Sequence, residues 1–261
     1  MNDFIATVQD RAAELIAAAA ETDVHMIPPC QIKGDWVASA AAMALVRKWE
    51  KSPIDIAEEL AKRIPIEQEG WFDAVEAKRG YVNLRLGPIW YATVAGTPPD
   101  DGPIVEDPVD PIPEDFPVEV DPGDWNFLVR MGGGVSPERA SARDSSNPAW
   151  YVRYTADRMA ELAEREGTAF PKEWNEPERD LLRRSASYVY RCWDPCPALG
   201  QYLTRLADTL WKEQENVCGA VKRRCARVLA AGYVQLSNEG KPKEDSAFPF
   251  PPILPGMPFM M

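Results

Sequence analysis

The chain of 261 residues is poor in the side chains that most often carry out chemistry. It has one histidine, His25, and five cysteines. A lone histidine is more often structural or solvent-exposed than catalytic, and we expect this of His25. Two cysteines occur in CWDPC, residues 192–196, but no pair of Cys-x-x-Cys units is present, which favours free core thiols over a zinc site. We therefore expect no catalytic residue, no metal and no cofactor.

Long apolar runs are also missing. No stretch reaches the roughly 18 consecutive apolar residues that a membrane-spanning helix needs. The N-terminal segment carries Asp3, Asp10 and Glu14 among its apolar positions, which predicts an amphipathic helix over about residues 2–20 rather than a signal peptide. An odd number of cysteines favours reduced thiols. Together these features predict a cytoplasmic protein with no membrane segment.

Basic residues are absent from residues 97–124, a segment with ten acidic residues and eight prolines. Proline interrupts helices and sheets and like charges repel, so the segment is predicted to be an extended, polyproline-like linker. Most of the net charge of −12 lies there. The linker divides the chain into an N-terminal domain (1–96), the linker itself (97–124), a second domain (125–240) and a Pro-rich tail (241–261).

The N-terminal domain is predicted to be α+β, with helices on an antiparallel sheet. The segment VHMIPP is expected to form a short strand that ends at its two prolines, and residues 37–49 are expected to form an Ala-rich helix. Ser52, followed by Pro53 and Asp55, predicts the N-cap of another helix. In FDAVEAKRGYVNLRL, residues 72–86, apolar and polar residues alternate around KRG, which indicates a β-hairpin.

Residues 125–240 are predicted to be an all-α helical bundle. Asn147 and Pro148 mark the start of one helix. Others are expected from near Glu176, from near Pro197, and over AVKRRCARVLAAGYVQL with an end at Gly232. MGGGVSP, residues 131–137, lacks the Gly-Lys-Ser/Thr exit of a phosphate-binding loop and is expected to be a flexible turn.

Two of these helices carry the densest basic patches. ERDLLRR places Arg179 and Arg183 on one side, and KRRCAR places Lys222, Arg223 and Arg227 on one side. The pattern favours phosphate contact and an ordinary solvated helix face about equally. Aromatic residues of the same helices could stack on unpaired bases, although we expect most of them in the core.

Residues 34–86, from GDWVASAAAMALVRKW to YVNLRL, resemble the N-terminal additional domain of arginyl-tRNA synthetases. NPAWYVRYTADRMAEL, followed by YLTRLADTLWK and ARVLAAGYVQL, resembles the helical, DALR-type anticodon-binding domain of the same enzymes. In those synthetases a catalytic domain with His-Ile-Gly-His-type and Lys-Met-Ser-Lys-Ser-type motifs separates the two modules. This chain contains neither motif. The resemblance therefore implies a synthetase-like protein that lacks the catalytic domain and is not an enzyme.

The resemblance also implies two RNA-binding surfaces. The first module of the family contacts the tRNA elbow, which makes Gln31, Lys33, Asp35 and Trp36 candidates around the turn at Gly34. The helical module reads the anticodon, and its candidates here are Tyr151, Tyr154, Arg179, Arg183, Lys222, Arg223, Arg227 and the terminal Met261. One departure from the family pattern is Ala40, which stands where the family has an asparagine that could cap a helix or contact RNA.

The implied function is that of a non-catalytic tRNA-binding adaptor. It would present tRNA, arginine tRNA in the first place, to a partner enzyme for modification or aminoacyl transfer. The alternative is a protein–protein interaction subunit that kept the fold and lost RNA binding, which the acidic linker and the negative net charge favour. A steep fall of tRNA affinity with salt is expected only for the first function.

Overall fold

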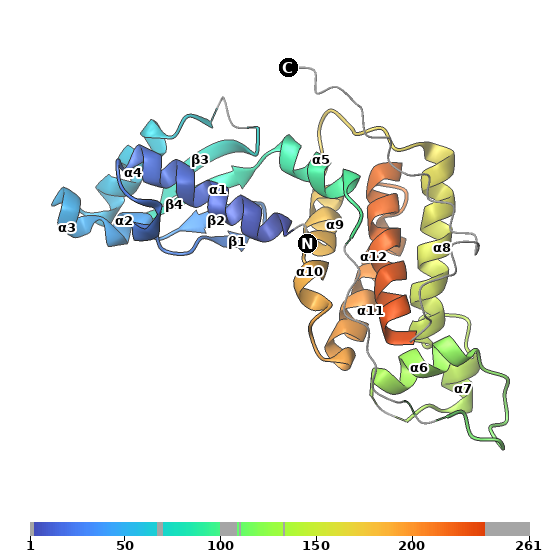
Figure 1. Cartoon of the computed structure of the whole chain (residues 1–261). Coiled ribbons are helices and arrows are strands. Elements are labelled where there is room, and N and C mark those ends of the chain that lie inside the picture. The colour runs from blue at the N-terminus through green and yellow to red at the C-terminus, as the bar shows by residue number, and fades with distance from the viewer. Residues whose placement is uncertain (1–2, 67–69, 100–108, 110, 133, 238–261) are drawn as a thin grey trace.

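The computed structural model describes residues 3–66, 70–99, 109, 111–132 and 134–237. An N-terminal antiparallel four-stranded sheet with helices is followed by a mostly helical region (Figure 1). Helix α5 runs from the end of the sheet toward the C-terminal helices, and residues of both parts belong to one continuous hydrophobic core. The two parts are called the sheet unit, residues 3–87, and the helical unit, residues 122–237.

The sheet has the strand order β1-β2-β4-β3, and all neighbouring strands are antiparallel. Its inward side chains, such as Val37, Val82 and Leu84, are fully buried beneath helices on one face. The strands are β1 (Gln31–Lys33), β2 (Trp36–Ser39), β3 (Phe72–Lys78) and β4 (Tyr81–Leu86), and the covering helices are α1 (Phe4–Ala19), α2 (Ala41–Ala44) and α4 (Pro53–Arg63).

Two predicted elements of the sheet unit are corrected. VHMIPP is not a strand, because the Asp23 side chain accepts a hydrogen bond from the His25 backbone N–H at 2.9 Å and caps the short 3-10 helix η1 (Val24–Met26). The helix predicted over residues 37–49 starts later. Its first residues form β2, since pairing with β4 buries Val37 and Ser39, and the remainder forms α2 and α3 (Val46–Trp49). Tertiary pairing thus overrides the local helix preference.

Other predictions for this unit are confirmed. The Ser52 hydroxyl accepts a hydrogen bond from the Asp55 backbone N–H at 3.2 Å and caps α4, whose first residue is Pro53. The predicted hairpin is β3–β4. Its turn residues Arg79 and Gly80 have φ of 53° and 79°, as expected for a tight two-residue hairpin turn.

Helix α5 (Pro88–Gly96) was not predicted, and it joins the two units. It follows β4 directly and buries Trp90 and Tyr91. The Trp90 indole N–H donates to the Phe4 carbonyl at 3.2 Å, which ties α5 to the start of α1. On its other side α5 packs against α9 and α12.

In the helical unit α12 lies at the centre and packs against α6, α8, α9 and α11. As predicted, Asn147 caps the helix that starts at Pro148, by accepting from the Trp150 backbone N–H at 3.2 Å. The helices are α6 (Pro122–Arg130), α7 (Pro137–Ser141), α8 (Pro148–Glu166), α9 (Glu176–Ala186), α10 (Tyr188–Arg191), α11 (Cys196–Glu213) and α12 (Gly219–Ser237).

Helix α12 does not end at Gly232 but continues to Ser237. At Gly232 the helix lies so close to α11 that a Cβ atom would come within 2.5 Å of a Leu203 methyl carbon. This glycine permits close helix packing and does not terminate the helix. The single helix predicted from Glu176 onward is two helices in the structure, α9 and α10, with a break at Ser187 between them.

The described part of the predicted linker packs against the helical unit and is not an extended segment without tertiary contacts. Phe116 packs edge-on against Trp125, with ring centroids 5.2 Å apart, and Val118 and Val120 are partly buried against the core. The linker's last residues already belong to α6, because the Asp121 carboxylate caps the N–H groups of Gly123 and Asp124. Residues 100–108 and 110 lie outside the described residues.

Candidate nucleic-acid interface

The sheet has one face that the covering helices do not occupy. Residues directly opposite each other on neighbouring strands share a face, and successive residues of a strand alternate between faces. The register pairs Lys33 with Trp36 and Trp36 with Arg85, so this face can be followed across β1, β2 and β4. We call it the open face; it carries Gln31, Lys33, Trp36, Ala38, Ala74, Glu76, Lys78, Tyr81, Asn83 and Arg85.

The centre of the open face combines an aromatic ring with a cation. The Arg85 guanidinium carbon lies 6.0 Å from the centroid of the half-buried Trp36 ring, within the range of a cation–π contact. Arg85 Nε also donates to Asp73 at 2.6 Å. Gln31 and Lys33 are exposed on the edge strand β1, and Tyr81 is exposed on β4. An exposed aromatic ring beside flexible cations can stack an unpaired base and bind its phosphate.

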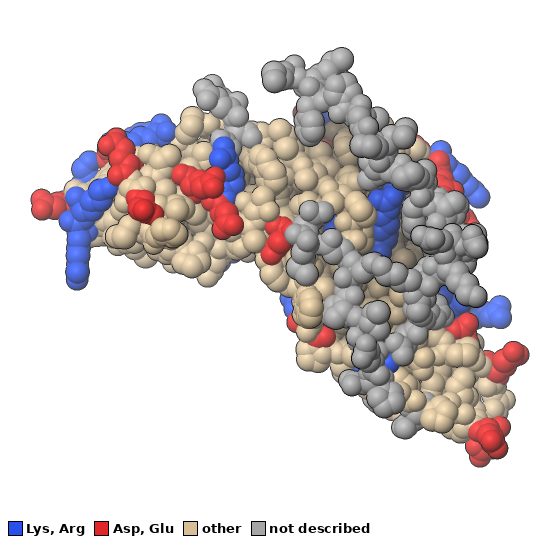
Figure 2. All heavy atoms as spheres, in the orientation of Figure 1, with Lys and Arg blue, Asp and Glu red and all other residues tan. Residues whose placement is uncertain are grey.

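The opposite side of the sheet unit is less suited to nucleic acid. Figure 2 shows the side from which α1 covers the sheet, where basic and acidic side chains are interspersed over the sheet unit. Several of them neutralise each other, as in the ion pairs of Arg63 and Lys51 with Glu59. Mixed charges do not build the positive potential that attracts a polyanion.

The turn between β1 and β2 places Asp35 at the tip of the hairpin. Gly34 has a φ of 60°, a left-handed conformation that favours glycine. The Asp35 carbonyl accepts a hydrogen bond from the Leu86 backbone N–H at 2.8 Å, which holds the turn against the end of β4. Ala40 stands at the N-cap of α2 and offers no side-chain hydrogen bond there, whereas the Ser39 hydroxyl accepts from the Ala41 backbone N–H at 3.2 Å.

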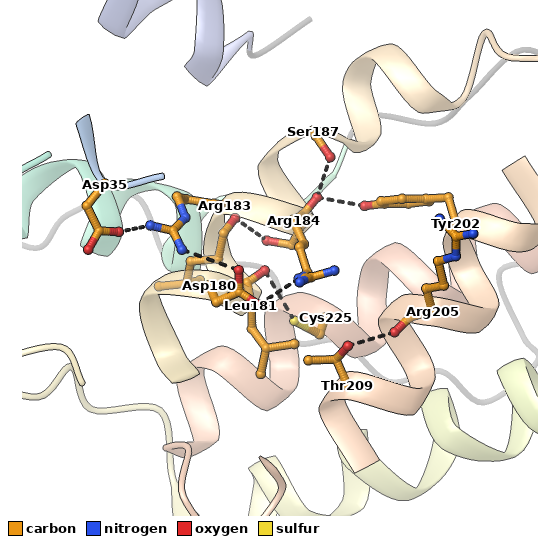
Figure 3. Close-up of polar contacts among 12 residues, drawn as sticks. Asp35, Asp180, Leu181, Arg183, Arg184, Ser187, Tyr202, Arg205, Thr209 and Cys225 are labelled. Carbon is orange, nitrogen blue, oxygen red and sulfur yellow. Dashed lines mark hydrogen bonds and ion pairs between the residues drawn. The ribbon is translucent and has the colours of Figure 1, made fainter. Parts of the chain in front are cut away.

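The Asp35 carboxylate is bound by three groups from outside the hairpin. Arg183 of α9 pairs with it directly (Figure 3), Arg179 Nε lies 3.4 Å from its Oδ2, and the Tyr91 hydroxyl donates to its Oδ1 at 3.0 Å. Burial raises the pKa of the Tyr91 hydroxyl, so it stays protonated and able to donate. The side chains of Asp35 and Arg183 are only 21% and 20% exposed.

Candidates from both halves of the sequence therefore meet at this cluster. Asp35 was a candidate for contact with a tRNA elbow. For Arg179 and Arg183 the sequence favoured phosphate contact elsewhere on the RNA and an ordinary solvated helix face about equally. The structure pairs them with each other instead. Arg183 and Arg184 are further paired with Asp180 on the same helix (Figure 3).

The other basic candidates lie on α12. Lys222 is 3% exposed and its ammonium donates to Glu166 at the end of α8, at 2.6 Å from Oε2. The expectation that Lys222 shares an accessible side with Arg223 and Arg227 is thus corrected. Arg223 and Arg227 are half-buried, and burial lowers the pKa of Arg227, with a smaller contribution from Arg223 one turn away.

The two tyrosine candidates of α8 differ in their surroundings. Tyr151 is buried in the core, whereas Tyr154 is 40% exposed. The Tyr154 ring stacks on Trp150, with centroids 4.6 Å apart and an interplanar angle of 9°, and tilts toward Trp211. Tyr154 therefore presents an aromatic surface and Tyr151 does not. Met261 lies outside the described residues.

The sequence reasoning missed Tyr81, Asn83 and Arg85. A signal for them was available, because YVNLRL places these three on the face opposite Val82, Leu84 and Leu86. It also treated KRRCAR as a surface patch, whereas Arg224 within it is 3% exposed. Arg224 donates to the Thr97 carbonyl at 2.6 Å, so it joins α12 to the end of α5.

In the described part of the chain, no group of three or more His, Cys, Asp or Glu side chains is arranged to hold a metal ion. None of the helices described combines the length and the apolar character needed to cross a bilayer.

Comparison with known proteins relates the sheet unit to one family. The family model "Arginyl tRNA synthetase N terminal domain" matches residues 2–86, which contain the whole sheet. Over 83 residues the chain is 29% identical to the arginine–tRNA ligase of Aliarcobacter butzleri (strain RM4018), an alignment that covers 32% of this chain and 15% of that ligase. No solved structure matches the chain significantly. The helices from α5 onward lie outside the family match.

Proposed function

We propose that this protein is a non-catalytic tRNA-binding adaptor, which presents a tRNA, arginine tRNA first of all, to a partner enzyme for modification or aminoacyl transfer. One observation carries the proposal. The region that matches the arginyl-tRNA synthetase N-terminal domain folds into a sheet whose open face gathers Gln31, Lys33, Trp36 and Arg85. That family relation makes tRNA the preferred nucleic acid.

The chemistry of the open face supports RNA as its ligand. Trp36 offers a ring for base stacking, and the exposed Lys33 and Lys78 offer cations for phosphates. Arg85 lies beside the ring but is paired with Asp73. Gln31 and Asn83 add donors and acceptors that can read base edges. Recognition of an unpaired loop needs these groups and no catalytic residue, in keeping with a chain that lacks both synthetase signature motifs.

The helical unit is proposed to contribute the second contact, as an anticodon-binding-type domain. Tyr154, Arg223 and Arg227 remain candidates there, and Tyr154 is the most exposed of them. The role of Tyr154 and Arg227 rests on the resemblance of residues 147–162, 202–212 and 226–236 to that domain, and that of Arg223 rests on its place in the basic patch KRRCAR.

The test is RNA recovery from the full chain, followed by a binding titration. RNA that co-purifies is sequenced against RNA recovered with an unrelated protein of similar negative charge, and we expect enrichment of tRNA. Affinity for a purified arginine tRNA transcript should then fall steeply between roughly 50 and 200 mM salt. Absence of tRNA enrichment together with a flat salt response would rule the proposal out.

The second candidate function is an RNA-independent interaction subunit. The observation that favours it is that several basic side chains of the helical unit are ion-paired. Arg179 and Arg183 pair with Asp35, and Lys222 pairs with Glu166. Affinity purification with and without nuclease distinguishes the two functions. A protein partner retained after complete RNA removal, with no tRNA bound, supports the second.

A further inference from the structure

The two units meet at a joint made of several polar contacts. We define the joint as the contacts of the sheet unit and α5 with α9, α10 and α12. Besides the Asp35 cluster, the Tyr190 hydroxyl of α10 donates to the Asp3 carboxylate at 2.7 Å. The Arg224 guanidinium of α12 lies over the Phe4 ring, 5.8 Å from its centroid, while it binds the Thr97 carbonyl.

The joint is buried enough to resist free rotation. Arg224 is 3% exposed, and Trp90 and Tyr91 of α5 are 1% and 2% exposed. The Tyr91 ring packs on Trp174, which precedes α9, with centroids 6.4 Å apart. Contacts from three helices of the helical unit thus hold the sheet unit, in addition to its covalent link through α5 (Figure 1).

Within this joint, Asp35 differs from the other residues because it lies in the β1–β2 hairpin, which also carries the RNA-binding candidates Lys33 and Trp36. It follows Gly34 and precedes Trp36, and Lys33 opposite Trp36 completes the turn. The carboxylate binds α9 while its neighbours in the sequence lie on the open face. The direction in which Trp36 and Lys33 face, relative to the helical unit, is therefore set partly by the bond between Asp35 and Arg183 (Figure 3).

A direct contact of Asp35 with RNA is disfavoured. Its two carboxylate oxygens already take up two arginines and a tyrosine hydroxyl. A phosphate brought to the same place would be repelled by the carboxylate and would have to displace it from two half-buried arginines.

We propose that Asp35 is a positioning residue, which fixes the angle between the open face and the helical unit so that one RNA molecule contacts both units at once. The inference rests on the proposed tRNA binding. When two weak contacts lie on one rigid body, formation of the first contact gives the RNA a high effective concentration at the second. A loose joint lowers that effective concentration, and the two units must then be ordered relative to each other during binding, which costs free energy. The two units bind tRNA as one surface only while the joint is closed.

The decisive variant is Asp35→Asn in the full chain, with Glu58→Gln as its control. Both replace a carboxylate by an amide, but Glu58 is exposed on α4, a helix on the covered face. Removing a negative charge by itself should slightly strengthen RNA binding. We expect the opposite for Asp35→Asn, namely about tenfold weaker binding of the arginine tRNA transcript, within the range typical of coupling between sites.

A structural readout accompanies the affinity. Small-angle X-ray scattering of the full chain should show a larger or broader distribution of dimensions for Asp35→Asn and an unchanged one for Glu58→Gln. Tyr91→Phe, which removes one hydrogen bond and keeps both ion pairs, should give a smaller loss in both measurements. The exchange of partners in the double variant Asp35→Arg with Arg183→Asp should recover part of the affinity.

The outcomes separate this inference from the proposed function. Tighter tRNA binding by Asp35→Asn would mean that the carboxylate blocks the arginines, and it would overturn the positioning role. Unchanged scattering, or a loosened joint with unchanged affinity, would overturn it as well while tRNA binding stands. If the unaltered chain binds no tRNA at all, the proposed function fails, and this inference fails with it.

Discussion

Asp35 and Arg183 form an ion pair between the tip of the β1–β2 hairpin and helix α9, two segments almost 150 residues apart in the sequence. The pair lies at the joint between the sheet unit and the helical unit, and each side chain is about one-fifth exposed. It shows that the two units are packed directly against each other, although a long acidic segment separates their main elements in the sequence. Its contribution to stability can be measured.

Replacement of Arg183 by alanine should destabilise the folded chain by about 1–3 kcal/mol, because it leaves half-buried carboxylates at Asp35 and Asp180 with fewer partners. Arg183→Lys keeps the charge but not the planar fork, and should lose less. Urea unfolding followed by circular dichroism measures both. A loss below about 0.5 kcal/mol, typical of an exposed pair, would contradict the role of Arg183 in the joint.

Lys33 and Trp36 should affect RNA affinity in different ways. Lys33→Gln removes one exposed cation, so tRNA binding should weaken and the slope of log K against log salt should fall by about 0.7–0.9. Trp36→Ala removes a stacking surface and should cost about 1–3 kcal/mol of binding without changing that slope. Lys212→Gln, an exposed cation paired with Asp208, serves as the control and should have little effect on either quantity.

Lys222 should matter for stability and not for RNA. Lys222→Met replaces a buried ammonium by an apolar side chain of similar length, and we expect tRNA affinity to stay the same and stability to change by less than about 1 kcal/mol. Glu166→Gln leaves that ammonium without its carboxylate. Because Glu166 is 40% exposed, water limits the loss, which should be about 1–3 kcal/mol. A drop in tRNA affinity for Lys222→Met would restore Lys222 as a phosphate contact.

Gly219 should not tolerate a side chain. A Cβ atom there would overlap the carbonyl oxygen of Gly167, a backbone atom that cannot rotate away. Gly219→Ala should therefore destabilise the chain by about 1–3 kcal/mol despite the better helix propensity of alanine. Gly134→Ala, with open space around the added carbon, is the matched control and should be neutral or slightly stabilising. Thermal unfolding compares the two, and equal shifts would contradict the packing argument.

The Cys225 thiol should make the chain sensitive to alkali. Burial raises the pKa of Cys225 to about 12, whereas a thiol in an unfolded chain titrates near pH 8.5. Below that pH both states are protonated and nothing is lost. Between about pH 9 and 12 only the unfolded state releases the proton, so stability should fall by up to about 1.4 kcal/mol per pH unit.

The control for this prediction is Cys225→Ala, which removes the thiol. Urea unfolding at a series of pH values up to about 11 should give a shallower decline for the variant than for the unaltered chain. Parallel declines would mean that other groups, and not Cys225, set the alkaline limit.

Some features could be predicted from the sequence because their causes are local. Ser52 and Asn147 cap helices through their own side chains, and the turn at Arg79 and Gly80 follows from the hairpin pattern around it. The antiparallel sheet with helices and the helical C-terminal region were predicted for the same reason. The relation of residues 2–86 to the arginyl-tRNA synthetase N-terminal domain was also evident from the residues themselves.

The tertiary structure alone decided what the candidate residues contact. The sequence singled out Asp35, Arg179 and Arg183 as charged residues with a role, but the two arginines lie against Asp35, across a joint that no local pattern encodes. Residues 36–39 form a strand because β4 lies beside them and pairs with them. Gly232 lies inside a helix because the close approach of α11 leaves no room for a side chain there. Local preferences are set by neighbours in the chain, whereas burial and ion pairing depend on which distant segments meet in space.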